Sequence, residues 1–199
     1  MSRYATLADL KYYLSPNGTL STSQDGLLQS SLDRAESAIN DYTRRNFAGT
    51  AGTVYYNRYQ ADLVRSQALY LREDLHTLVG LQTGNGQNIP VGSVWLEPRN
   101  AGPPYRVLRL HSQYVYQWNT DSDVIISGTF GYGTTPPDAV VQATVRYAAH
   151  LFRQKDAGGM AGVDVAGFTD AGEVSFPKGM PDDVRWLLSP YRSRSGGVV

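Results

Sequence analysis

The feature that most constrains this fold is a change in the spacing of apolar residues along the chain. Towards both ends they recur every three or four positions, as on one face of an α-helix, whereas between residues 52 and 134 they follow the period of two expected of strands. One regular element cannot satisfy both periods. The sequence therefore predicts an α+β chain in which an inserted β region interrupts a helical bundle.

Three helices are expected in the bundle, at about residues 7–14, 24–45 and 138–155. The second has a single apolar stripe, so it must pack against other helices. The third is apolar around most of its circumference, so we expect neighbours to cover it. The residues expected to form the helical core are Leu28, Leu32, Ala35, Ile39, Tyr42, Val141, Val145, Ala148 and Phe152.

The insertion, at about 52–134, contains runs rich in β-branched and aromatic residues, separated by Gly, Pro, Asn and Asp. The runs are 54–59, 68–71, 77–83, 93–96, 105–110 and 124–130. Short strands at this spacing predict an antiparallel sheet or a small barrel. Glu73 and Asp74 are assigned to a charged turn between two of these strands, and the alternative is a paired-carboxylate site.

Residues 1–157 are expected to form the core of the protein, and residues 158–199 an extended arm. Glycines recur through 157–180 without hydrophobic periodicity, which is typical of a mobile segment. A short helix at about 181–189 presents Trp186, Leu187 and Leu188. These side chains either fold back on the bundle or bind a groove on another subunit, with Arg192 and Arg194 at the rim.

The composition gives little indication of catalysis. Lys plus Arg and Asp plus Glu each number 18, so the chain lacks the basic excess typical of a dedicated DNA binder. There are no cysteines, and His76, His111 and His150 do not have metal-ligand spacing. We expect no enzyme activity, no metal and no cofactor. The rival hypothesis, a β-rich binding module or small hydrolase, requires carboxylates or histidines that converge in one cleft.

Other features bear on location and contacts. The chain has no apolar run long enough to span a bilayer and no signal sequence, so we expect synthesis in the cytosol and no membrane contact. Its 14 tyrosines exceed what one small core needs, and Tyr12 and Tyr13 lie together on a short helix. Because tyrosine is enriched at protein interfaces, this favours contacts with other polypeptides.

The order of these features resembles the head-tail connector proteins of tailed bacteriophages, also called adaptor or head-completion proteins. The resembling segments are 4–10, 32–47, 126–132 and 138–152, and the resemblance spans about residues 4–157. It implies a non-enzymatic virion subunit, made in the host cytoplasm, that forms a ring of about twelve copies beneath the portal protein. The β insertion would face the DNA channel or the next tail or stopper protein.

The resemblance also implies roles for particular residues. Trp186, Leu187, Leu188 and Tyr191 would anchor the arm on the portal, with Arg192 and Arg194 at the rim of that contact. Packaged DNA would pass through the ring without sequence-specific binding, which suits a chain of zero net charge. The alternative within the same class is another ring-forming phage component, either a stopper or a tail terminator.

Overall fold

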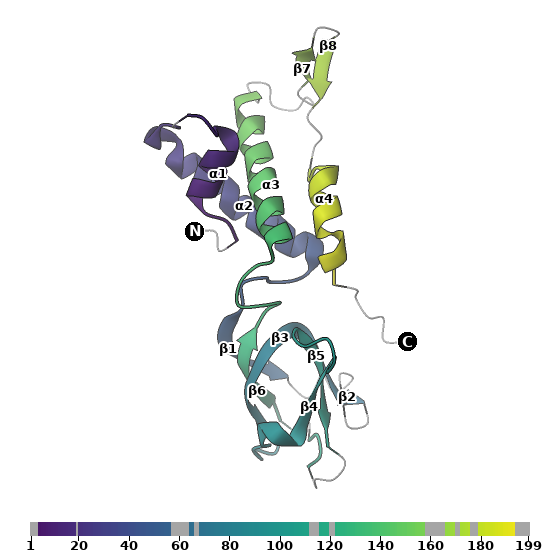
Figure 1. Ribbon diagram of the computed structural model, residues 1–199. Coiled ribbons are helices and arrows are strands. Elements are labelled where there is room, and N and C mark those ends of the chain that lie inside the picture. Colours follow the sequence, from purple (N-terminus) through teal and green to yellow (C-terminus); the bar gives the residue numbers. More distant parts are fainter. Residues whose placement is uncertain are drawn as a thin grey trace. The chain divides into compact units, whose positions relative to one another are not determined.

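The computed structural model describes residues 4–18, 20–56, 64–65, 68–111, 116–119, 122–157, 166–169, 172–175 and 179–193 (Figure 1). The chain divides into two compact units. The helical unit consists of Met1–Arg44 and Pro136–Val199, and the β unit is Arg45–Thr135.

The helical unit contains α1 (Leu7–Leu14), α2 (Asp25–Thr43), α3 (Asp138–Ala157) and α4 (Asp182–Leu188). The short 3-10 helices η1 (Thr22–Gln24) and η4 (Ser189–Tyr191) adjoin α2 and α4. A capping box fixes the start of α1: the Asp9 amide donates to the Thr6 hydroxyl, and the Thr6 amide donates to the Asp9 carboxylate. These hydrogen bonds from Thr6 lower the pKa of Asp9.

The core of the helical unit lies where α2 packs against α3. From α2, Leu28, Leu32, Ala35 and Ile39 are fully buried. From α3, the fully or largely buried residues are Val140, Ala143, Thr144, Val145, Tyr147, Ala148, Ala149 and Phe152. Several of these are small, which lets the two helices approach closely. Tyr42 and Val141, which the sequence places in this core, are only partly buried.

The β unit contains one antiparallel sheet. Its strands are β1 (Thr50–Tyr56), β2 (Val64–Arg65), β3 (Ala68–Gln82), β4 (Val94–Glu97), β5 (Tyr105–Leu110) and β6 (Val124–Phe130), with the 3-10 turn η3 (Val91–Ser93) before β4. The order is β1-β6-β3-β5-β4, and β2 pairs with β3. Among the described residues no ladder joins β1 to β4, so the pairing is that of an open sheet.

The strands of this sheet supply most of the hydrophobic core of the β unit. The core residues are Tyr56, Leu69, Leu71, Leu75, Leu78, Leu81, Ile89, Val94, Leu108, Leu110, Val124 and Ile126. The side chains of Trp118 and Tyr116 pack against it. The helical unit and the β unit therefore each have a hydrophobic core of their own.

The sequence interpretation of β3 was wrong in one respect. Residues 68–82 form a single strand, whereas the sequence predicted two strands with Glu73 and Asp74 in a turn between them. The register of β3 shifts near Tyr70, Leu75 and Leu78, as at β-bulges. These irregularities bury Asp74 and Leu75 side by side, which breaks the alternation on which the sequence reading depended.

The C-terminal region differs from a structureless arm. A two-stranded antiparallel pair forms there from β7 (Ala166–Thr169) and β8 (Gly172–Ser175), for which no strands were predicted. Much of the predicted mobile segment lies outside the described residues. No helix in the described part of the chain is long and apolar enough to cross a membrane.

Candidate docking site

Helix α4 uses one side to pack on the chain's own bundle. Val184 and Leu188 are buried where α4 meets α3, and the ion pair between Arg146 and Asp183, 3.1 Å from Nη1 to Oδ2, links the same two helices. Of the two alternatives for this helix, folding back on the bundle therefore holds for this side. Leu188 belongs to the helical core, so its prediction as a docking residue is wrong: its side chain is fully buried and another polypeptide cannot contact it.

The opposite side of α4 is open. Trp186 lies two residues after Val184, about 200° around the helix, and is 75% exposed. Leu187, between the two sides, is half-buried. No residue in the described part of the chain covers the Trp186 indole. It therefore offers a large apolar surface that another protein could contact.

The chain after α4 runs along the end of α2. The Ser193 amide donates to the Thr43 carbonyl at 2.8 Å, and the Arg192 guanidinium lies 5.0 Å from the centre of the Tyr42 ring. Tyr191 is half-buried and Arg192 is exposed. Arg194, predicted at the rim of the docking contact, lies outside the described residues. The described segment therefore presents Trp186 and Arg192 to solvent.

A second exposed surface lies between α1 and α3. A groove of about 660 Å³, mainly apolar, is bordered by Tyr12 and Tyr13, which are 72% and 45% exposed. Its floor includes Val141 and Val145 of α3. A smaller hollow adjoins the groove, and it is lined by Tyr13 together with residues of α3 and α4. The tyrosine pair that the sequence assigned to an interface therefore borders a concave surface, a form typical of protein contacts.

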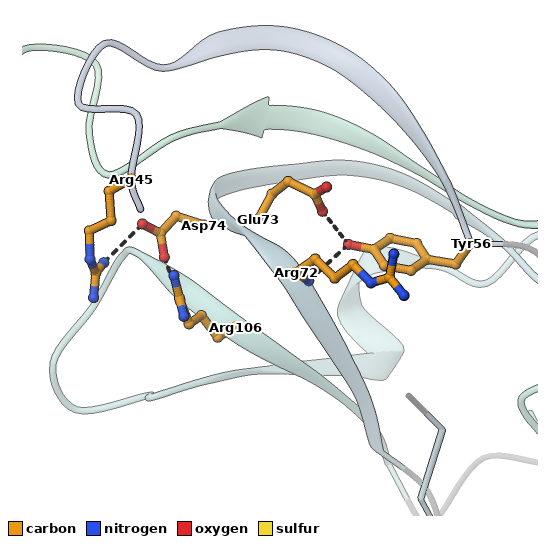
Figure 2. A network of polar contacts seen from close by, with 6 residues as sticks. All are labelled: Arg45, Tyr56, Arg72, Glu73, Asp74 and Arg106. Carbon is orange, nitrogen blue, oxygen red and sulfur yellow. Dashed lines mark hydrogen bonds and ion pairs between the residues drawn. The ribbon is translucent and has the colours of Figure 1, made fainter. Parts of the chain in front are cut away.

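The β unit contains a buried polar network, shown in Figure 2. Asp74 is 5% exposed, and its two carboxylate oxygens accept from Arg45 Nη1 at 2.9 Å and Arg106 Nε at 2.6 Å. Arg45 opens the β unit and Arg106 lies on β5, so this carboxylate ties the entering chain to β3 and β5. Sequence analysis missed this network, because no short-range pattern relates residues 45, 74 and 106.

The neighbouring carboxylate has different partners. Glu73 points away from Asp74 and accepts from the Tyr56 hydroxyl at 2.7 Å (Figure 2). Burial, reinforced by Glu73, raises the pKa of Tyr56 well above its ordinary value. Paired-carboxylate catalysis needs two acids that face one substrate. Here each carboxylate is occupied by its own donors, so the arrangement is that of a structural network.

The three histidines lie on separate elements. His76 is in β3, His111 follows β5 with its ring 4.4 Å from that of Trp95, and His150 is in α3, 2.9 Å from Gln154 Nε2. Within the described ranges, no group of three or more His, Cys, Asp or Glu residues is placed to hold a metal ion.

Comparison with solved structures gives the fold a context. A chain of the neck of an empty gene transfer agent (GTA) particle, computed with C6 symmetry, superposes with a TM-score of 0.59 and 19% identity, covering 94% of this chain and 88% of that one. A chain from the virion of the native particle superposes with a TM-score of 0.58 and 21% identity, again covering 94% of this chain and 88% of that one. A chain from the native neck, computed with C12 symmetry, superposes with a TM-score of 0.55 and 17% identity, covering 94% of this chain and 90% of that one.

The superpositions span nearly the whole chain, so this protein shares the fold of GTA particle neck chains, including both of its units. No protein-family model matches the sequence. No curated protein matches it in sequence either.

Proposed function

We propose that this chain is a structural subunit of the head-tail neck of a phage-like particle, where identical copies form a ring beneath the portal. The observation that carries the proposal is the shared fold over 94% of the chain with neck chains, including one from a neck computed with C12 symmetry. The segments that resemble connector proteins lie in both units, which supports the same assignment.

In this proposal the exposed side of α4 contacts the portal. Trp186 is the anchor, Leu187 and Tyr191 extend the apolar contact, and Arg192 lies at its rim. Leu188 supports α4 from within the bundle, because it is fully buried. Trp and Arg are among the residue types that most often dominate protein–protein binding energy.

The mechanism is mechanical. Each copy makes modest contacts, and a closed ring repeats them, so the assembly is stable without any single strong interface. The ring would extend the DNA channel and present the next tail or stopper protein with a repeated surface. The zero net charge of the chain suits a channel that DNA must leave, since a strongly basic wall would retain it.

The test is binding of the full chain to the purified portal protein of the same particle. Trp186→Ala should weaken binding by about tenfold or more, as expected for an interface anchor, with the fold unchanged. Val79→Ala is the control, because it shortens another exposed apolar side chain, 69% exposed, that lies in β3 of the β unit. Wild-type chain that binds only a tail protein would instead favour a stopper or tail terminator.

A further inference from the structure

Among the described residues, the sheet of the β unit has two open edges, and one of them, β1, lacks the usual protection of an edge strand. Its seven residues pair with β6 in an unbroken register from Thr50 to Tyr56. All of them but Val54 and Tyr56 are exposed, and Tyr55 is 59% exposed. Natural edge strands avoid pairing with other chains through charges, prolines, bulges or short length. β1 has no charged residue, no proline and no bulge.

A glycine at the centre of β1 is a second, independent observation. Gly52 does not have a positive φ, and a Cβ atom built on it would meet nothing within 4 Å. Glycine weakens a strand, and within one usually marks a bulge or the close approach of another backbone. There is no bulge at Gly52, and among the described residues only its ladder partner Gly128 of β6 lies opposite it. The described part of the fold therefore does not require glycine at this position.

The other end of the sheet is β4, whose outer side carries no ladder among the described residues. β4 has four residues, contains Glu97 paired with Arg109 of β5, and is followed directly by Pro98. These features limit the length of any added pairing to about the four residues of β4. Because every pairing along the order β1-β6-β3-β5-β4 is antiparallel, β1 and β4 run in the same direction.

We propose that β1 of one copy adds to the open edge of β4 of the next copy, so that the β units join through their sheets around the ring. The inference rests on the proposed ring. In a ring, one rotation relates each copy to the next, and repeating it closes the assembly. Because β1 and β4 run in the same direction, that rotation can bring β1 of one copy beside β4 of the next as parallel strands. Backbone hydrogen bonds supply the contact. Side chains of a strand project to the two faces of its sheet, so Gly52 leaves those faces uncrowded next to the added strand.

The first test uses Gly52→Lys in the full chain, because a lysine on an edge strand opposes its pairing with another chain. A side chain at Gly52 meets nothing within 4 Å and glycine weakens a strand, so the melting temperature should equal or exceed that of the wild type. Ring formation on the portal, seen by electron microscopy, should fall by about tenfold or more, because the weakened contact recurs at every interface. Gly26→Lys is the matched control, since Gly26 also has open space around it but lies in α2; its rings should equal those of the wild type.

The second test identifies the partner strand. The chain has no cysteine, so introduced thiols react alone. Thr53→Cys and Glu97→Cys chains are mixed, assembled on the portal and treated with a flexible bismaleimide. The inference expects a cross-linked dimer from the mixture and none from either chain alone. A dimer from Thr53→Cys alone would mean that two β1 strands pair about a twofold axis, and would overturn it.

The remaining outcomes separate the two proposals. If wild-type rings form, Gly52→Lys rings form equally well and the mixture gives no cross-link, the sheet contact is wrong and the neck assignment stands. If the wild-type chain forms no ring on the portal, the neck assignment fails and the sheet contact fails with it.

Discussion

Replacing Asp74 with alanine tests whether the buried network stabilises the β unit. Asp74 is 5% exposed and accepts two charge-assisted hydrogen bonds, from Arg45 and Arg106, whose side chains are 16% and 29% exposed. Each such bond contributes about 1.5–3 kcal/mol, and removing one member of a buried ion pair costs about 3–5 kcal/mol. Because both guanidinium groups remain partly hydrated, we expect the lower end, a loss of about 3 kcal/mol in unfolding free energy.

The assay is urea unfolding followed by tryptophan fluorescence. Two of the three tryptophans, Trp95 and Trp118, lie in the β unit, and Trp186 is already 75% exposed, so the signal reports mainly on the β unit. Glu97→Ala is the matched control, because it breaks the half-exposed ion pair with Arg109 and should cost less than about 1 kcal/mol. If Asp74→Ala costs no more than Glu97→Ala, the network is not a stabilising element and the reasoning fails.

Three further changes are predicted together. Leu188→Ala should lower the unfolding free energy of the helical unit by about 3 kcal/mol, because Leu188 is fully buried, whereas Trp186→Ala should change it by less than about 0.5 kcal/mol. Thermal melts followed by circular dichroism compare the two variants. Equal losses would contradict the assignment of a buried and an exposed side to α4. The raised pKa of Tyr56 keeps it protonated in the folded chain while the unfolded chain ionises above about pH 10, so stability should fall as the pH rises past that point. Tyr56→Phe should remove part of this fall in urea unfolding at pH 9 and pH 11, and an unchanged fall would contradict the buried position. Thr6→Ala removes the capping box of α1 and should cost about 1 kcal/mol in the same thermal melts, and no loss would show that the cap is not formed.

The sequence predicted helices and strands well where a single stripe of apolar residues marks the buried face of the element. The stripe of Leu28, Leu32, Ala35 and Ile39 indicated α2, and these side chains are fully buried. The interpretation of the chain as α+β, with a strand-rich region between helices, is confirmed in that general form. The turn signals of Pro and Gly bounded most strands to within a few residues.

The interpretation failed where a contact between distant residues overrides local preference. Glu73 and Asp74 were predicted to lie in a turn, because acidic residues are disfavoured in strands. Asp74 is tolerated inside β3 because Arg45 and Arg106, 29 and 32 residues away, neutralise it. The bulges that bury it cannot be read from a period of two.

The candidate docking site was only partly visible in the sequence for a similar reason. The apolar run Trp186, Leu187, Leu188 has no local feature that says which side chain faces the bundle. Only the packing of α4 on α3 separates the buried Leu188 from the exposed Trp186. The unprotected β1 edge was equally hidden, since strand order and the space around Gly52 arise only in the folded chain.

Native mass spectrometry of the full chain mixed with its portal protein tests the central claim most directly, because it counts subunits. The account predicts one complex in which a complete ring of about twelve copies accompanies each portal, with few partly filled species, as repeated contacts imply. A chain that stays monomeric at every portal concentration, or binds the portal in scattered numbers without a closed ring, would contradict it.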